Sequence, residues 1–535
     1  MAAKAHRRRC SRTGDAKAAR SLHAVLGLVT GSASCKVAPV RPRTALYGVF
    51  YALVAVLATA PAWIVKHPPL QDLPFHVATL RLIHDAHNPA FGFSDVYQTA
   101  LLETEYLLYY VVGDLLAFVM GVKAASVAMV CLYLGGMPLA MGALLRALGR
   151  DERLCLFAVP LSVNAMFCFG LLPYVFGFPL MLLSLAVAVR HFEKPTLRRG
   201  IALGVLTVLT FFAHVLPFAL FGIGCIALFP WTRLRRWLPA GAPLALGLLL
   251  VAWWVLGSKA GGGAFSNLKG MTPFLPVDAA LSQFLRWSIN VFRDTSDESW
   301  FVLLAMVALA ALGLSAGDRD TAHPIARGWF LLPVTCVVGY LSLGDHLGDV
   351  WLFGQRFAVP AILTTVPLLR MPRGGRGVAI TAAALAVAVG STVNVCKHFI
   401  QFEREDVGDL DGAIAAMEPR KHVAGLIYDR GSPVMSELYS PFIHFVSYYQ
   451  VEKGGVVQFA YTGFPHWPVQ YKPGMYPPPG TVPRLRWEWT PEQVPISELF
   501  PYYDYVLVRG NGFYPPPGTF HVAWRGPRWT VWQRD

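Results

Sequence analysis

An acidic residue lies just beyond the first long apolar segment of the chain. Asp72 belongs to the sequence QDLPFHVA at residues 71–78, and His76 follows it by four positions. A carboxylate at a membrane surface can act as a general base that takes the proton of an acceptor hydroxyl or amine. Residues four apart share one face of a helix, so we expect His76 beside Asp72. The alternative is that Asp72 only caps a surface helix that runs to about His84, because Asp is favoured at the N-cap and Pro in the first turn.

Two further acids, Glu103 and Glu105, close the same loop before the next apolar segment. Opposite Asp72 they could assist as an acid or bind substrate, and Asp72 with Glu105 could hold a divalent metal. The alternative is that both glutamates only solvate the rim of the loop. The sequence identifies no cofactor and leaves the metal open.

Arg356 and the preceding Gln355 stand at the start of another apolar segment, in the sequence GQRFAVP at 354–360. A guanidinium binds phosphate or pyrophosphate well, because it offers a planar fork of donors. The alternative is that Arg356 only reaches out to lipid headgroups. His214 also lies inside an apolar segment, where it could bind substrate or merely bond a backbone carbonyl.

These residues belong to a chain built mostly of apolar blocks. Of its 535 residues, 55% are hydrophobic and 15% are charged, against about 25% charged in soluble domains. The first uncharged block, 44–65, has 22 residues, and a bilayer span needs about 20. The composition excludes a disordered protein, a collagen and an ordinary soluble enzyme.

We predict an α-helical polytopic membrane protein with about eleven transmembrane helices. The expected spans are 45–64, 106–120, 124–145, 154–169, 174–190, 201–229, 241–257, 300–316, 328–343, 358–370 and 378–397. Two basic loops, 146–153 and 190–200, conflict with this count under the positive-inside rule. We therefore expect that 106–120, or half of 201–229, does not cross fully.

The N-terminal segment 1–43 carries ten Lys or Arg against one acid. Such a segment could bind nucleic acid or anionic lipid, and its Arg-rich, acid-poor composition is also that of a transit peptide. Because a span follows directly, we interpret it as a disordered cytoplasmic segment, and we expect membrane lipids and no nucleic acid as partners. The loops 65–105, 258–299 and 344–357 then lie on the other side, together with the C-terminal region.

The expected transmembrane domain covers 44–397, and the composition changes after it. Pro-rich stretches and short β-like runs predict a small extracytoplasmic α+β domain over 398–535. The eight Cys contain no C-x-x-C pair, so we expect neither a disulfide framework nor a structural zinc site.

The order of these features resembles one family. The chain resembles the GT-C superfamily of integral membrane glycosyltransferases in four features. They are an acid-bearing loop after the first span, a second long loop several spans later, an Arg in G-Q-R-F-x-x-P before a late span, and a C-terminal domain outside the membrane. This group includes protein O-mannosyltransferases and lipid A aminoarabinose transferases. The resemblance implies a donor sugar on a polyprenyl phosphate or pyrophosphate, with Asp72 as base or metal ligand and Arg356 on the lipid phosphate. Many members carry paired acids in the first loop, whereas Asp72 stands between Gln71 and Leu73.

We therefore expect a glycosyltransferase at the outer face of a bacterial cytoplasmic membrane. Its expected catalytic residue is Asp72, and the expected substrate-binding residues are His76, Glu103, Glu105, His214, Gln355 and Arg356. One alternative is a lipid or saccharide transporter, which should show broken polar helices and internal repeats. The other is a non-catalytic envelope-assembly protein whose aromatic-rich C-terminal region binds a partner.

Overall fold

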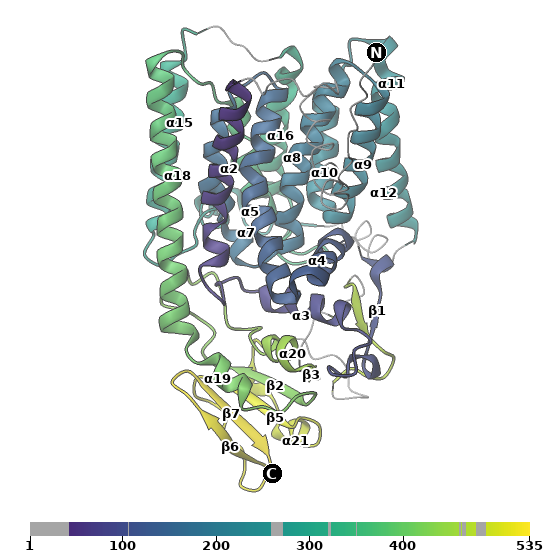
Figure 1. Ribbon diagram of the computed structural model, residues 1–535, viewed down its shortest axis with the longest axis vertical. Coiled ribbons are helices and arrows are strands. Elements are labelled where there is room, and N and C mark those ends of the chain that lie inside the picture. Colours follow the sequence, from purple (N-terminus) through teal and green to yellow (C-terminus); the bar gives the residue numbers. More distant parts are fainter. Residues whose placement is uncertain are drawn as a thin grey trace, which may run out of the picture.

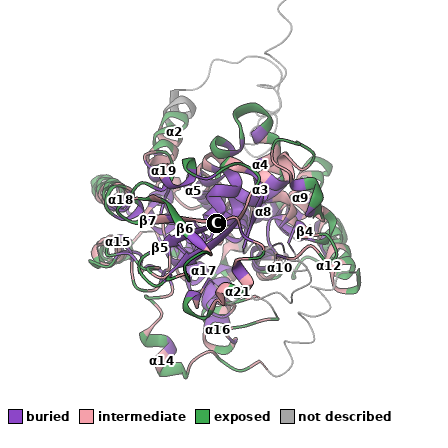
Figure 2. Ribbon diagram, turned by 90° about the horizontal axis from the view of Figure 1, so that it is seen from below, coloured by how far each residue is buried: buried purple, intermediate pink, exposed green. Residues whose placement is uncertain are grey.

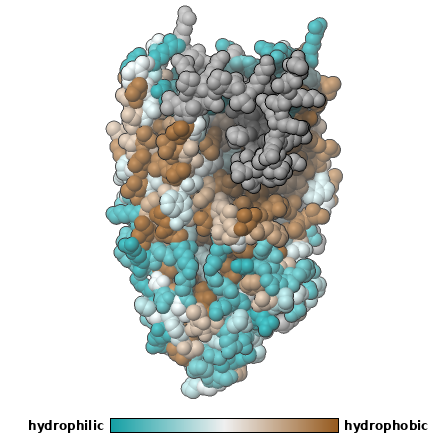
Figure 3. All heavy atoms as spheres, viewed as in Figure 1, coloured by the Kyte–Doolittle hydropathy of each residue, from teal (hydrophilic) through white to brown (hydrophobic). Residues whose placement is uncertain are grey.

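The computed structural model shows a tall layer of helices that rests on a smaller domain (Figure 1). It describes residues 42–104, 106–257, 271–318, 323–348, 350–458, 462, 467–477 and 488–535. Apolar side chains cover much of the helical layer, while hydrophilic ones dominate the domain below it (Figure 3). The expected segment 1–43 lies almost wholly outside the described residues.

The helical layer contains both long and short apolar helices. Five helices of the described residues are long and apolar enough to cross a membrane: Val122–Ala147 (α5), Leu172–Glu193 (α8), Leu234–Gly257, Ser296–Leu314 (α15) and Gly375–Val407. The span Leu234–Gly257 contains α11 (Trp237–Gly241) and α12 (Ala245–Gly257), and the span Gly375–Val407 begins with α18 (Gly375–Gln401). The other helices of this layer are α2 (Pro42–Trp63), α4 (Leu107–Met120), α6 (Ala158–Ser162), α7 (Ala165–Cys168), α9 (Leu197–Ala213), α10 (Val215–Leu228), α14 (Val277–Ser282), α16 (Leu331–Ser342) and α17 (Ala358–Leu363). The predicted spans 154–169 and 358–370 are thus short helical pieces, and the expected count of eleven is met only in part.

Burial separates inner helices from outer ones. In α8, 89% of the most apolar window is buried, whereas only 11% is buried in α15 and in the helix that ends with α12. Leu248 and Leu309 on these outer helices are 74% and 68% exposed. From below, the buried residues gather around α5 and α8 and the exposed ones lie at the periphery (Figure 2). Large exposed apolar surfaces of this kind mark contact with lipid, so the chain is an integral membrane protein.

Helix α4 does not cross the layer. Tyr106, at its start, packs against Trp467 of the C-terminal region, with ring centroids 6.2 Å apart. Lys123, just past its end, pairs with Glu452 of the same region at 2.6 Å. Both ends of α4 therefore lie at the end of the layer that carries the domain. Segment 201–229, by contrast, forms two helices, α9 and α10, which both pack against α8.

The two basic loops gather at the opposite end of the layer. Glu152 accepts a hydrogen bond from Tyr51, in the first half of α2, at 2.6 Å. His323 joins the same end, because its N–H donates to the carbonyl of Leu148 and its Nε2 lies 3.5 Å from Glu193. Both loops therefore lie away from the C-terminal domain, which agrees with the expectation that 106–120 does not cross fully, since the 14 residues of α4 stay at the domain end.

A mixed five-stranded sheet forms the centre of the C-terminal domain. Its strand order is β3-β2-β5-β7-β6, with β2 parallel to both β3 and β5 and the remaining pairs antiparallel. The strands are β2 (His422–Ile427), β3 (Val456–Val457), β5 (Tyr505–Arg509), β6 (Phe520–Arg525) and β7 (Trp529–Arg534), and the helices are α19 (Leu410–Ala415), α20 (Ser447–Lys453) and α21 (Ile496–Leu499). All five residues of β5 are buried, as expected for a central strand with covered faces.

The domain shares its packing with the first loop. Strand β1 (Tyr97–Thr99) of that loop pairs antiparallel with β4 (Val469–Tyr471) of the C-terminal region. Helix α20 packs against α3 (Leu73–His84), and one continuous hydrophobic core contains residues of both regions. The C-terminal region is thus built onto the loop that carries Asp72.

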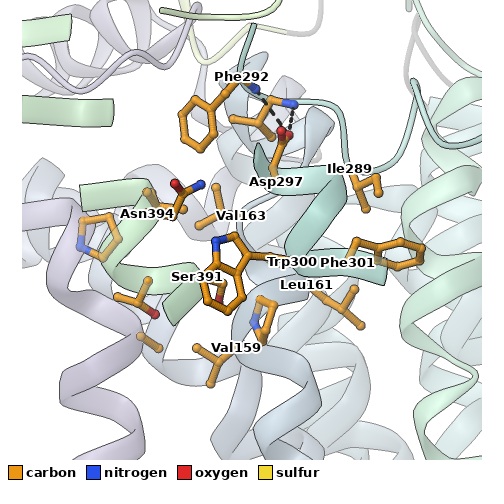
Figure 4. Close-up of a pocket in the computed structure, with 16 residues that line it drawn as sticks. Val159, Leu161, Val163, Ile289, Phe292, Asp297, Trp300, Phe301, Ser391 and Asn394 are labelled. Atoms are coloured by element: carbon orange, nitrogen blue, oxygen red, sulfur yellow. Dashed lines mark hydrogen bonds between the residues drawn. The ribbon is translucent and has the colours of Figure 1, made fainter. Parts of the chain in front are cut away.

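The second loop is tied to the start of α15. Asp297 accepts hydrogen bonds from the backbone N–H groups of Val291 and Phe292 (Figure 4). Below it lies a mostly apolar pocket between α2, α6, α15 and α18, into which Trp300 projects. Residues 258–270 of this predicted loop lie outside the described part of the chain.

Candidate functional site

The main chain of Asp72 is fixed by the turn that precedes α8. Its N–H donates to the carbonyl of Phe169 at 3.1 Å, and the N–H of Gln71 donates to Cys168 at 2.9 Å. Gly170 permits this approach: it has a φ of +79°, and a Cβ there would lie 2.5 Å from the nitrogen of Asp72. Only glycine suits both conditions. Helix α3 begins directly after Asp72 and runs to His84, as predicted.

The carboxylate of Asp72 turns away from its own helix. Asp72 occupies the N-cap position, yet its side chain makes no hydrogen bond to the amides of α3. Instead, Oδ1 lies 3.3 Å from Nε2 of His444 and 3.5 Å from Nε2 of Gln71. Only 6% of Asp72 is exposed. Capping therefore does not account for the position of this carboxylate.

His444 reaches Asp72 from the C-terminal region. Its ring lies on that of Phe75, with centroids 3.8 Å apart, and it is buried. Burial lowers the pKa of His444, so the imidazole is neutral at neutral pH. A carboxylate accepts hydrogen bonds, so Nε2 of His444 carries the hydrogen and donates it to Asp72. The pair holds the carboxylate in one orientation.

His76 lies beside this pair, as the four-residue spacing predicts. Its Nδ1 is 2.8 Å from the hydroxyl of Tyr110. Burial lowers the pKa of His76 to about 4, although the charge of Asp72 acts in the opposite direction. His76 is therefore neutral at neutral pH, and it adds no positive charge next to Asp72.

Glu488 is a second carboxyl group within the electrostatic reach of Asp72. It is 5% exposed, and its Oε2 has no hydrogen-bond partner among the described residues. Burial, with a further contribution from the charge of Asp72, raises the pKa of Glu488 well above its ordinary value. A carboxyl group that keeps its proton at neutral pH can act as a general acid.

Arg356 is a buried cation just before the start of α17. It is 8% exposed, its Nη2 donates to the carbonyl of Trp351 at 3.1 Å, and its Nε has no hydrogen-bond partner within the described residues. Its guanidinium lies 5.6 Å above the ring of Tyr174. A buried cation without a carboxylate partner costs several kcal/mol, on the order of the penalty for a buried ion. Arg356 is therefore suited to an anionic ligand.

His214 offers a second donor next to Arg356. It separates α9 from α10 with an extended backbone, and its Nδ1 accepts the N–H of Leu216 at 3.0 Å. A neutral imidazole whose Nδ1 accepts carries its hydrogen on Nε2. That Nε2 lies 3.4 Å from Nη1 of Arg356. Two donors thus face each other, an arrangement that an anionic oxygen would stabilise.

Two aromatic residues, Trp467 and Tyr106, connect the two groups of residues, and we call them the aromatic bridge. The ring of Trp467 lies 5.6 Å from that of His76 and 6.2 Å from that of Tyr106, whose ring stacks on His214 at 5.2 Å. Trp467 is held in place by a 2.9 Å hydrogen bond to Thr79. The carboxylate and the cation therefore belong to one continuous region at the domain end of the helical layer.

Three of the predicted site residues are not brought into this region. The side chain of Gln355 donates to Asp345 in its own loop at 2.6 Å. Glu103 is exposed and accepts from Gln470 on β4 at 3.1 Å. Glu105 lies outside the described residues. In the part of the chain that the structure describes, no group of three or more His, Cys, Asp or Glu could hold a metal ion.

Sequence reasoning missed His444, Glu488 and the role of Trp467. All three belong to the C-terminal region, where they follow no spacing that relates them to Asp72. The one available signal was the presence of ionisable residues in an apolar, aromatic setting. Only the pairing of β4 with β1 and the packing of α20 on α3 bring the region onto the first loop.

Comparison with known proteins identifies the fold. No protein-family model matches the chain, and no curated protein matches its sequence. Among solved structures, the chain is similar to the crystal structure of ArnT from Cupriavidus metallidurans in the apo state. The two share 11% identity with a TM-score of 0.54, over 92% of this chain and 98% of that one. The chain therefore shares the fold of that structure.

Proposed function

We propose that this protein is a membrane glycosyltransferase that moves a sugar from a polyprenyl-phosphate-type donor to an acceptor at the outer face of the cytoplasmic membrane. The orientation of Asp72 carries this proposal. Its carboxylate makes no capping hydrogen bond to the backbone amides of α3 and instead contacts His444 of the C-terminal region. Protein structures maintain such an arrangement when a carboxylate must be aimed at another group.

The transfer step uses Asp72 as general base. The acceptor oxygen forms a bond to the anomeric carbon of the sugar while the bond from that carbon to the phosphate oxygen breaks. The acceptor proton passes to Asp72, and the electron pair of the broken bond leaves with the phosphate. His444 keeps the carboxylate in place during this step, with its Nε2 3.3 Å from Oδ1.

Arg356 and His214 would bind the lipid phosphate of the donor. Their side chains lie close together, with 3.4 Å between Nη1 and Nε2. Donors fixed before the reaction stabilise the negative charge that develops on a departing phosphate. A polyprenyl chain is too apolar to leave the bilayer, and the exposed apolar helices of the layer would surround it.

The distribution of charge supports the proposed orientation. The basic loops gather at the end of the layer opposite the C-terminal domain, and such loops face the cytoplasm. Asp72 and the domain would then face the extracytoplasmic side. A reaction at this boundary lets the lipid tail remain in hydrocarbon while the sugar meets an acceptor in water.

Reconstituted full-length protein distinguishes chemistry from transport. Proteoliposomes would receive a polyprenyl phosphate that carries a radiolabelled sugar, together with a membrane extract as source of acceptor. Release of polyprenyl phosphate with label bound covalently to an acceptor supports the transferase. Movement of intact labelled lipid across the bilayer, without a covalent product, would instead favour a transporter.

A further inference from the structure

A polar cavity of about 370 Å³ lies in the C-terminal domain, close to the second loop. Arg293, Tyr428, Asp429, Arg430, Glu437 and Ser440 contribute to its lining. It opens on the protein surface. None of the sequence motifs discussed above points to it.

The charges around the cavity balance one another. Arg293 pairs with Glu437 at 3.5 Å, with both side chains substantially exposed. Asp429 pairs at 3.6 Å with Arg509, a buried arginine behind the wall. The lining carries two arginines, Arg293 and Arg430, and two acids, Asp429 and Glu437, so its formal charge is zero and it favours neither a free phosphate nor a polycation. It favours a neutral ligand that both donates and accepts hydrogen bonds.

A sugar hydroxyl has that property, since it donates one hydrogen bond and accepts two. Guanidinium groups only donate and carboxylates only accept, so the neighbouring lining residues Asp429 and Arg430 together suit adjacent hydroxyls of a saccharide. Arg430 is held in place by Trp489. It donates to the carbonyl of Trp489 and lies 5.7 Å above the ring of the same residue.

The cavity wall is joined to Asp72 through one side chain. The N–H of Ser440 donates to Oε1 of Gln71 at 2.9 Å, while Nε2 of Gln71 lies 3.5 Å from Oδ1 of Asp72. On the other side, Trp489, which anchors Arg430, follows Glu488 directly in the chain. Asp72 is thus linked to the lining residue Ser440 through Gln71, and Glu488 is the chain neighbour of the residue that anchors Arg430.

We propose that this cavity binds the acceptor, and that the acceptor is a neutral saccharide which approaches from the aqueous side. Gln71 lies between the bound saccharide and Asp72, and its displacement brings a hydroxyl of the saccharide to the carboxylate. This inference rests on the proposed function for its meaning, but it makes a claim about binding that can be tested separately.

The test measures binding by the full-length protein in lipid nanodiscs. Saturation-transfer NMR would be recorded with maltotriose, cellotriose, mannotriose and chitotriose, for the wild type and for Arg430→Gln. We expect transfer to at least one trisaccharide, weakened about tenfold in Arg430→Gln, as for the loss of a charge-assisted hydrogen bond. Arg525→Gln, which changes an exposed arginine on β6, should bind as the wild type does.

Three outcomes would overturn the inference. They are no transfer to any of the four trisaccharides, equal binding by Arg430→Gln, or displacement of the trisaccharide by inorganic phosphate. Asp72→Asn serves to separate the two proposals, because the cavity should still bind saccharide in that variant. If Asp72→Asn keeps full sugar transfer while the binding results stand, the proposed function fails and the saccharide site remains.

Discussion

The imidazole of His444 donates a hydrogen bond to the carboxylate of Asp72, with 3.3 Å between Nε2 and Oδ1. The two residues come from opposite ends of the sequence, one from the first loop and one from the C-terminal domain. The carboxylate would otherwise be free to cap α3, which is the common role of an aspartate at that position. The domain therefore determines where this carboxylate points.

His444→Phe tests that role directly. Phenylalanine keeps the ring that packs on Phe75 but removes the donor to Asp72. We expect the rate of sugar transfer to fall about a hundredfold, the cost of a misplaced reacting group. The KM for the donor should hardly change, because Arg356 and His214 remain in place. His444→Gln, which restores a donor, should recover part of the rate; equal rates in both variants would contradict the role.

Arg356→Gln should weaken the binding of the donor. The guanidinium is buried and has no carboxylate partner within the described residues, so its charge is available to a phosphate. Loss of a charged hydrogen bond of about 2 kcal/mol raises the dissociation constant of a polyprenyl phosphate by about 30-fold. Binding would be measured by titration with the phosphate lipid that lacks a sugar, with Arg525→Gln as control. Unchanged affinity would place the phosphate elsewhere.

The raised pKa of Glu488 predicts that the folded protein loses stability at high pH. Its raised pKa means that the folded state favours the protonated carboxyl. This contribution is fully present below the ordinary pKa of 4.5 and is lost as the pH rises through the raised value. Glu488→Gln resembles the protonated form, so its unfolding temperature should fall less between neutral and alkaline pH. Glu492→Gln, an exposed neighbour, should follow the wild type, and parallel curves for all three would argue against a buried protonated Glu488.

The lowered pKa of His76 predicts that the folded protein loses stability at low pH. Its pKa is lowered from 6.5 to about 4 by burial. Its contribution to stability is present above pH 6.5 and is lost as the pH falls towards 4, by up to about 3 kcal/mol. His76→Gln should remove much of this dependence when thermal unfolding is followed by tryptophan fluorescence. His87→Gln alters an exposed histidine of the same loop; if it flattens the curve equally, His76 is not the responsible group.

Local signals made part of the site predictable. A carboxylate after a span, Pro in the first turn of a helix and a histidine four positions later are features of adjacent residues, and the structure places Asp72, α3 and His76 accordingly. Arg356 and His214 stood out because ionisable groups are costly inside apolar segments. Their proximity to each other could not be predicted, because it depends on how α9, α10 and α17 pack.

Long-range packing decided the rest. The 14 residues of α4 are apolar enough to resemble a membrane crossing. Two contacts with the C-terminal region show that the helix stays at one end of the layer: Tyr106 with Trp467 before it, and Lys123 with Glu452 after it. In the C-terminal region, short strands and loops with many aromatic residues give no periodic signal. The proximity of His444 and Glu488 to Asp72 therefore depends on how that region packs against α3, which the sequence pattern does not indicate.

The central claim is that Asp72 removes the acceptor proton, and one comparison tests it most directly. Transfer from labelled polyprenyl-phosphate sugar would be measured for Asp72→Asn and for Glu103→Gln, which neutralises an exposed carboxylate of the same loop. We predict a loss of at least about a hundredfold in Asp72→Asn, as expected for a general base, with wild-type rates in Glu103→Gln. Full transfer by a folded Asp72→Asn protein would contradict the account.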